Sequence, residues 1–169
     1  MSAKFKKIGD IKKVERIIKS MPQRIREVTR PGFEQMGMFY QGEIVRGMDS
    51  QAPAGQPFVP LSPKTVEARA KRRGTASTKA LIDTAGMRNS VTHKVMRTPI
   101  AVFIGLLRTT MHPETGQPVA NLGEIHENGT AAIPARPFVD PIARSRSLRR
   151  RARRVFYRSV RAHRSRLMR

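Results

Sequence analysis

The C-terminal end of the chain carries charge of one sign only. Between Arg144 and Arg169 there are twelve arginines and no aspartate or glutamate, and the last acidic residue before them is Asp140. The whole chain has 34 basic and 12 acidic residues, a net charge of +22, far above that of an ordinary small soluble domain. We therefore expect an anionic partner, and we interpret residues 142–169 as an arginine-rich helical arm.

The supply of core residues is thin for a chain of 169 residues, which is long enough for one ordinary domain with extensions. Aromatic residues make up 5%, tryptophan is absent, and the nine methionines specify packing only weakly. Because cysteine is also absent, neither a disulfide framework nor a thiolate metal site can form. We expect partners to contribute part of the stability.

Hydropathy gives no sign of a membrane partner. The chain has no run of 18 apolar residues, and its first twenty residues lack the apolar stretch of a signal peptide. We therefore expect a soluble protein without an export signal.

The N-terminal region, residues 1–48, has the spacing of amphipathic helices. Apolar residues recur at steps of three and four between residues 11 and 28, and the pattern resumes from Phe33 to Met48. Pro22 interrupts the first run, and Ser20 is a suitable N-cap for a second helix with Pro22 in its first turn. The pattern predicts long N-terminal helices with a bend or a restart at Pro22.

The region 49–141 begins with a loop and a short helix. Residues 49–63 contain four prolines, too many for a helix interior, and we interpret them as an ordered loop docked on the core. Ser62 is then the N-cap of a basic helix that has Pro63 at its first position and ends at Gly74. We expect residues 74–79, with the sequence GTASTK, to be mobile.

After Ser90 the apolar period changes from helical to two. Val91, His93 and Val95 alternate with their neighbours, and the alternation returns from Ile100 after a turn at residues 97–99. A short helix is predicted over 119–127. The fold class is therefore α+β, with long N-terminal helices, a small antiparallel β-sheet centred on residues 87–106, and a C-terminal basic helix.

Catalytic candidates are few. The densest titratable cluster is Glu124, His126 and Glu127, which could form a metal site or an acid–base pair. A zinc-protease helix needs a second histidine four residues after the first, but that position is Thr130. No nucleophile elbow of the Gly-x-Ser-x-Gly type and no phosphate-binding glycine loop occur. We expect no enzymatic activity, no metal and no cofactor.

Seven arginines of the arm are candidate contact residues for DNA or a partner. They can bind phosphates, an interaction that ignores sequence and weakens as salt rises. They can also face the carboxylates of neighbouring subunits, and both interpretations stay open. The seven are Arg149, Arg150, Arg151, Arg153, Arg154, Arg158 and Arg161.

Five motifs follow one another along residues 55–140: GQPFVPLSPKTVEARAKRRG, ALIDTAGMRNSV, AVFIG, EIHENGT and IPARPF. Their order resembles the tail-completion or virion morphogenesis (head–tail joining) family of tailed bacteriophages. The chain departs from the family pattern where Ala85 intervenes before Gly86, where Met87 replaces leucine and where Phe58 replaces the more common tryptophan. The motif positions are Phe58, Pro60, Leu61, Ser62, Thr65, Leu81, Thr84, Gly86, Gly105, His126, Gly129, Arg136, Pro137 and Phe138.

The resemblance implies a structural, non-enzymatic virion protein. Such a protein lies at the head-facing end of the tail, often as a ring that commonly has six copies, and makes the tail competent to join a DNA-filled head. The implied partners are further copies of the chain, neighbouring neck, connector and tail-tube proteins, and DNA in the channel. The implied location is the head–tail joint of the virion, after assembly in the host cytoplasm. The alternative is a general nucleic-acid-binding basic protein of the packaging or ribosomal type.

The last motif belongs to a stiff segment, residues 133–141, that we call the strap. Pro134 and Pro137 restrict it to extended geometry at little entropic cost. We expect Phe138 to fill the core beneath it. We also expect Arg136 to pair with a carboxylate such as Glu124, Glu127 or Asp83, in its own subunit or in the next.

Two glycines of the motifs are expected to make turns. We expect Gly86 to adopt a positive φ where the chain enters the first strand, with Met87 anchoring that strand in the core. Gly129 should end the short helix, with Thr130 turning the chain.

Overall fold

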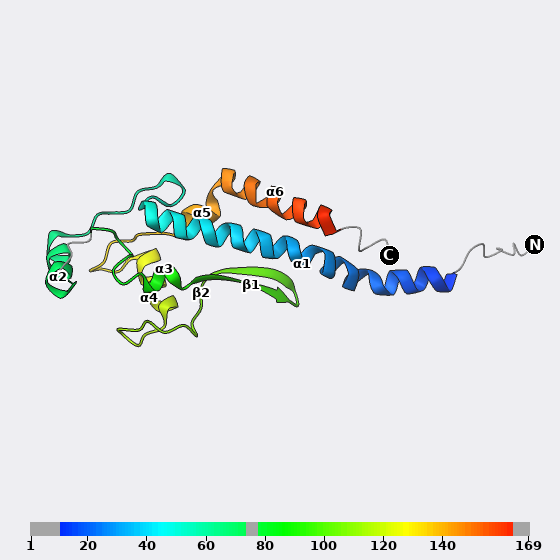
Figure 1. Cartoon of the computed structure of the whole chain (residues 1–169), viewed down its shortest axis with the longest axis horizontal. Helices are drawn as coiled ribbons and strands as arrows, with labels where there is room; N and C mark the ends of the chain where they lie inside the picture. The colour runs from blue at the N-terminus through cyan, green and yellow to red at the C-terminus, as the bar shows by residue number, and fades with distance from the viewer. Residues whose placement is uncertain (1–10, 74–77, 164–169) are drawn as a thin grey trace, which may run out of the picture.

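The computed structural model describes residues 11–73 and 78–163. Long helix α1 runs most of the length of the molecule, with α6 along one side and the β-hairpin along another (Figure 1). This architecture confirms the predicted α+β class, with its small antiparallel sheet and basic C-terminal helix. In order, the elements are α1 (Ile11–Ser50), the 3-10 turn η1 (Pro53–Gly55), α2 (Pro63–Arg73), α3 (Gly86–Asn89), β1 (Val91–Arg97), β2 (Ile100–Leu106), α4 (Val119–Asn128), α5 (Asp140–Arg144) and α6 (Arg146–His163).

Helix α1 is one helix of 40 residues with Pro22 and Pro31 inside it. The predicted restart at Pro22, with Ser20 as its cap, is therefore wrong. A proline in a helix interior removes one backbone hydrogen bond and costs about 3 kcal/mol. Val28, which lies between the two prolines, is only 3% exposed, so packing favours a helix that continues through both.

At two glycines of α1, Gly32 and Gly37, neighbouring elements approach the helix closely. A side chain at Gly32 would collide with Phe156 of α6, and one at Gly37 would collide with His93 of β1. Phe33 adds an edge-to-face contact with Phe156, the ring centroids being 5.0 Å apart. Helix α1 is thus the scaffold on which both α6 and the hairpin rest.

The two strands pair antiparallel, with Val91 opposite Leu106 and Arg97 opposite Ile100, which confirms the predicted hairpin. Gln41 of α1 holds β1 in place. Its Nε2 donates to the carbonyl oxygen of Val91 at 2.9 Å, and its Oε1 lies 2.6 Å from Nδ1 of His93. The hairpin is therefore attached to α1 by polar contacts as well as by packing.

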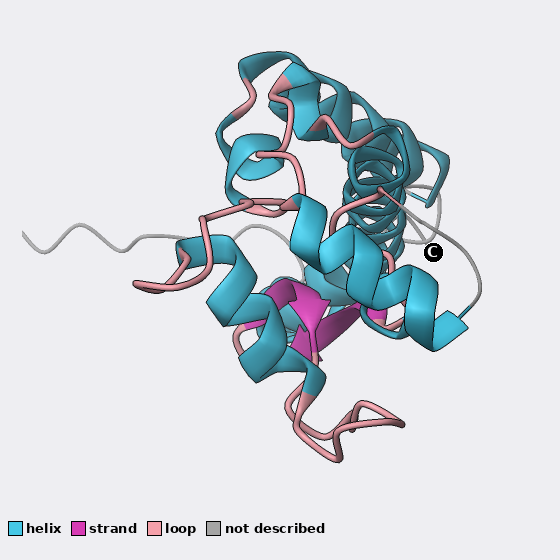
Figure 2. Cartoon of the chain, turned by 90° about the vertical axis from the view of Figure 1, so that its left-hand side faces the viewer, coloured by secondary structure: helices cyan, strands magenta, loops and turns pink. Residues whose placement is uncertain are grey.

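One core joins residues from all three predicted regions, 1–48, 49–141 and 142–169. Ile142 and Leu148 are buried in the same cluster as Ile44, so the base of the arginine-rich arm is part of the core. The end of the molecule that faces the viewer in Figure 2 is built from short helices joined by loops. The buried cluster comprises Ile44, Met48, Phe58, Ala80, Leu81, Met87, Val91, Val119, Phe138, Ile142 and Leu148.

Candidate functional site

Motif residues that are far apart in the sequence meet around one small cavity. The cavity has a volume of about 120 Å³ and lies between α2, α3, α4 and the strap. Six of its lining residues are motif positions: Leu61, Leu81, Thr84, Gly86, His126 and Arg136. The remaining lining residues are Arg69, Asp83, Ala85, Met87, His112 and Leu122.

Arg136 of the strap is buried, with 5% of its surface exposed. Its Nε donates to the carbonyl oxygen of Val59 at 2.7 Å, and its Nη2 donates to that of Pro60 at 2.9 Å. Within its own chain the predicted carboxylate partner is therefore wrong, because the fork binds two backbone oxygens of the 49–63 loop instead. The planar guanidinium matches two acceptors one residue apart, which an ammonium cannot do. Burial, and secondarily the charge of Arg69, lower the pKa of Arg136.

Arg69 of α2 is the second buried arginine, 8% exposed. Its Nη1 donates to the carbonyl oxygen of Lys79 at 2.8 Å, and its Nε lies 3.6 Å from the carboxylate of Asp83. The same carboxylate accepts a hydrogen bond of 2.9 Å from Arg72. One acidic side chain is thus shared by two arginines at the edge of the cavity.

Two histidines complete the polar wall. His126 of α4 and His112 both line the cavity, and Nδ1 of each is buried without a hydrogen-bond partner among the described residues. Burial lowers the pKa of His126, and the charges of Arg136 and Arg69 lower it further, so His126 is neutral at pH 7. The sequence pattern pointed to His126 but gave no signal for His112.

The turn before α3 differs from the prediction. Gly86 is the first residue of α3 and has no positive φ; the left-handed conformation falls on Ala85 (φ 58°) and on Leu81 (φ 62°). Met87 is buried, as predicted, but on α3 rather than on the strand. Ala85 takes the left-handed position, and next to it the Gly86 amide donates to Thr84 Oγ1 at 3.3 Å.

Other motif residues behave as predicted. Ser62 caps α2, since its Oγ accepts a hydrogen bond from the Thr65 amide at 3.2 Å. Phe58 within the 49–63 loop is buried, which confirms that this loop is docked. Gly129 follows α4 with a φ of 74°, and Thr130 Oγ1 accepts a hydrogen bond from the Ile133 amide at 3.1 Å. The predictions that Gly129 ends the helix and that Thr130 turns the chain are therefore confirmed.

Glu127 has a structural role that the sequence did not reveal. Its carboxylate accepts hydrogen bonds from the amides of Phe138, Val139 and Asp140, at 2.9, 3.1 and 2.7 Å. These amides lie at the start of α5, where a negative charge is favourable. Glu127 therefore fixes the strap to α4. Among the described residues no group of three or more His, Asp or Glu side chains is arranged to hold a metal.

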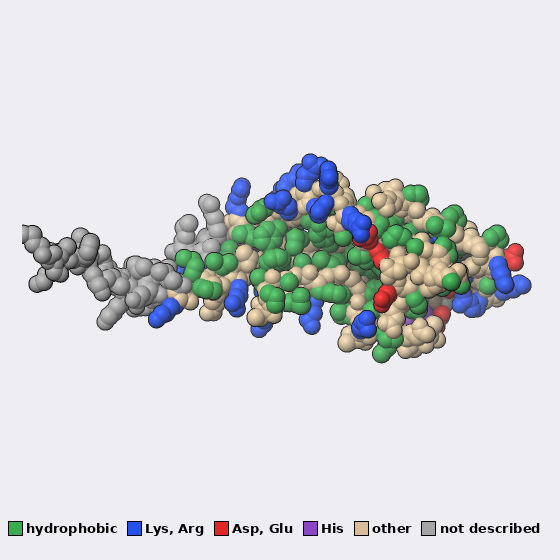
Figure 3. All heavy atoms as spheres, turned by 180° about the vertical axis from the view of Figure 1, so that it is seen from behind, with side chains coloured by type: hydrophobic (Ala, Val, Ile, Leu, Met, Phe, Trp, Pro, Cys, Tyr) green, Lys and Arg blue, Asp and Glu red, His purple; other side chains and the backbone are tan. Residues whose placement is uncertain are grey.

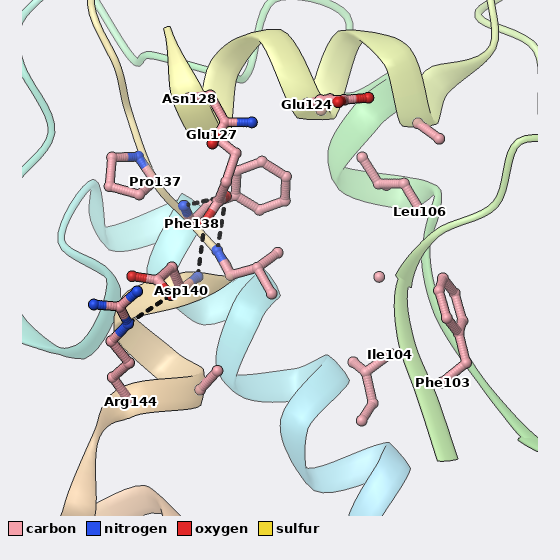
Figure 4. A pocket seen from close by; sticks show the side chains of 15 residues that line it. Phe103, Ile104, Leu106, Glu124, Glu127, Asn128, Pro137, Phe138, Asp140 and Arg144 are labelled. Atoms are coloured by element: carbon pink, nitrogen blue, oxygen red, sulfur yellow. Dashed lines mark hydrogen bonds and ion pairs between the residues drawn. The ribbon is translucent and has the colours of Figure 1, made fainter. Parts of the chain in front are cut away.

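A groove of about 700 Å³ lies between β2, α4 and the strap (Figure 4). Gly105 of β2 and Pro137 and Phe138 of the strap line it, so three more motif positions meet there. Phe138 is only 2% exposed, which confirms that it fills the core beneath the strap. The groove is lined by β2, which is an edge strand of the two-stranded sheet, and an edge strand is a place where a further chain can pack.

Helix α6 presents its arginines outward. Leu148 and Ala152 are buried against the body, while all seven candidate arginines are exposed. Figure 3 shows Lys and Arg side chains gathered along the edge formed by α6. Within residues 11–73 and 78–163, only Arg151 of the seven forms an ion pair, 3.6 Å from Glu43. Leu167 and three further arginines of the arm lie outside the described residues.

Comparison with known proteins gives no relative. No family model matches the chain, and neither a curated protein nor a solved structure does so. Among the described residues, no helix is long and apolar enough to cross a membrane.

Proposed function

We propose that this protein is a structural virion protein of a tailed phage, a tail-completion or neck protein at the head–tail interface. It makes the tail competent to join the DNA-filled head and acts as an oligomeric ring rather than as an enzyme. The observation that carries the proposal is the outer face of α6, where a buried apolar stripe orients exposed arginines that have almost no acidic neighbours in the described chain.

The charge of this face makes a partner necessary. Six of the seven arginines have no ion pair among the described residues, and the whole chain carries +22. Copies placed side by side in a ring would repel one another unless anions lie between or beside them. DNA in the channel and acidic surfaces of neighbouring neck, connector and tail-tube proteins are partners of the required charge.

The fold suits a rigid connector more than a flexible nucleic-acid tail. Leu148 and Ala152 hold α6 on α1, and Phe156 packs against Phe33. A protein that binds single strands needs aromatic side chains free to stack on bases. Of the two aromatics on α6, only Tyr157 is exposed, at 57%. This observation favours assembly over the general nucleic-acid-binding alternative.

The decisive experiment replaces Arg150, Arg153, Arg154 and Arg158 together by glutamine in the phage that encodes the chain. We expect a folded protein with an unchanged unfolding midpoint, complete heads and tails, and few joined particles. The matched control replaces the same four residues by lysine, which keeps the charge and should keep most of the joining. A normal yield of infectious particles from the glutamine variant would contradict the proposal.

A measurement of mass in solution separates the two partners of the arginines. Light scattering at low and high salt, with and without DNA, is informative because phosphate contacts weaken steeply as salt rises. If the protein forms an oligomer whose mass does not change with DNA, the arginines face carboxylates of neighbouring subunits. A monomer that binds DNA of any sequence places the genome there, and the glutamine variant should then lose that binding.

A further inference from the structure

A groove of about 670 Å³ lies between α1 and α6. The two helices run side by side in opposite directions (Figure 1), since Phe33 contacts Phe156 while the later Glu43 pairs with the earlier Arg151. Every described residue that lines the groove belongs to one of these two helices. The groove therefore has two helical walls, to which no third element of the described chain contributes.

The wall formed by α6 is one continuous face of that helix. Six of its residues recur at steps of three and four, the spacing of one side of an α-helix. From the first to the last of them the helix rises by about 16–17 Å, or three turns. Gln35 and Phe39 of α1, one turn apart, form the opposite wall. The six residues of α6 are Arg151, Arg154, Val155, Arg158, Ser159 and Ala162.

The groove combines apolar surface with positive charge. Phe39 and Val155 are half-buried, whereas Arg154 and Arg158 are exposed. Neither of these two arginines forms an ion pair with another described residue. No Asp or Glu lines the groove within residues 11–73 and 78–163. An occupant that matches the groove therefore carries carboxylates beside apolar side chains.

The apolar surface favours a protein segment over DNA. Phosphates can bind the arginines, but they gain nothing from contact with Phe39 and Val155. A base needs a free aromatic face on which to stack. The guanidinium of Arg151 lies over the Phe39 ring, 5.3 Å from its centroid, and Tyr40 contacts the same ring edge-to-face at 5.5 Å. Little of this ring is therefore left for a base.

We propose that the groove between α1 and α6 binds an acidic amphipathic helix of a partner protein. Apolar side chains of that helix, spaced by three and four residues, pack against Phe39 and Val155. Its carboxylates pair with Arg154 and Arg158. The inference rests on the proposed role of the α6 arginines in assembly, and it narrows their partner from anions in general to the carboxylates of a protein helix.

The first test measures the binding of two synthetic peptides to the full chain, by fluorescence anisotropy at about 0.15 M salt. Both peptides have about 18 residues, or five helical turns, with the same glutamates along one side. One has leucine and the other alanine at every position of the opposite side that faces the groove. The leucine peptide should bind at least about ten times more tightly, because only its side chains fill the apolar part of the groove.

Two double variants with the same loss of charge locate the binding on α6. Arg154→Gln with Arg158→Gln should weaken binding of the leucine peptide by at least about tenfold. Arg150 and Arg153 are exposed but do not line the groove. Their replacement by glutamine should therefore weaken binding by less than about threefold, because charges away from the contact are screened at this salt concentration.

A third variant, Ser159→Phe, fills the groove and leaves every arginine in place. Its affinity for the leucine peptide should fall at least about tenfold, while its affinity for an oligothymidylate of equal charge should not change. Ala162→Phe, at an exposed position of the same wall, makes the same test if Ser159→Phe does not fold. The mass of Ser159→Phe in solution, measured by light scattering without peptide, should equal that of the original chain.

Three outcomes would overturn the inference. The first is equal affinity for the leucine and alanine peptides, which would show that only charge is recognised. The second is an equal effect of the two double variants, on peptide binding or on the joining of heads to tails. The third is a lower mass of Ser159→Phe, which would show that a second copy of the chain covers the groove. None of these outcomes contradicts the proposed function, which fails instead if the four-residue glutamine variant joins heads to tails normally.

Discussion

The strap and α6 use arginine in opposite ways. Arg136 of the strap is buried, and its guanidinium is fixed by two carbonyl oxygens of the 49–63 loop. The arginines of α6 are exposed, and only Arg151 of the seven candidates has an acidic neighbour within the described chain. The same residue type therefore links two segments of the fold in the strap and remains available to partners on α6. Substitutions in the two regions should therefore affect different measurements.

The largest expected effect is on the core beneath the strap. Phe138→Ala should lower the free energy of unfolding by about 3–5 kcal/mol, because it leaves a cavity in place of a fully buried ring. Tyr157→Ala on α6, where the ring is 57% exposed, should change it by less than about 1 kcal/mol. Urea unfolding measures both. Equal losses of unfolding free energy in Phe138→Ala and Tyr157→Ala would contradict the difference between the strap and α6.

Arg136→Lys should come next. The ammonium cannot reach both the Val59 and Pro60 carbonyls in the geometry of the fork, so we expect a loss of about 2–3 kcal/mol. The matched control is Arg154→Lys on α6, expected within about 0.5 kcal/mol of the original chain. If the two variants were equally stable in urea, the hydrogen bonds of Arg136 to the 49–63 loop would not contribute to stability.

Glu127→Gln sharpens the account of how the strap is held. The amide keeps one acceptor oxygen but loses the charge and one of the sites that bind the Phe138, Val139 and Asp140 amides. A loss of about 1–2 kcal/mol is expected, against less than about 0.5 kcal/mol for Glu124→Gln, since Glu124 is exposed. Reversal of this order in urea unfolding would show that the cap is unimportant.

The smallest effect concerns pH. Burial, Arg136 and Arg69 lower the pKa of His126 in the folded chain, so the unfolded chain takes up a proton there at a higher pH. The stability from neutral His126 is fully present above the ordinary value of about 6.5 and is lost as the pH falls through the lower, folded pKa. His126→Phe should therefore lose less stability between pH 7.5 and 5.5 than the original chain, measured in chloride buffer. An unchanged slope would contradict this.

Local pattern predicted most of the elements. The hairpin, the Ser62 cap, the end of α4 at Gly129 and the burial of Phe138 follow from periodicity and from the preferences of serine, glycine and proline, which act over a few residues. The uninterrupted α1 did not follow, because the cost of Pro22 is local whereas the gain from packing around Val28 comes from distant elements. The positive φ of Ala85 likewise contradicts the preference for glycine at such positions.

The candidate site was predicted only in part. Spacing and motif order singled out His126, Arg136 and Thr84, but nothing in their neighbourhood along the chain indicated that they share one cavity. The true partners of Arg136 are backbone oxygens almost eighty residues earlier in the chain, and a carbonyl oxygen has no signature in a sequence. His112 was missed for the same reason, since its role depends on contact with a distant wall.

The sequence by itself determined most of the elements, the excess of positive charge and the confinement of the arm's charge to arginine, because these properties depend on composition and on spacing over a few residues. Only the tertiary structure decided which arginines are buried and which face outward. It also decided that Glu127 caps α5 and that two histidines meet beside Arg136. These outcomes depend on distances between segments far apart in the chain, and such distances are set by the packing of α1 against its neighbours.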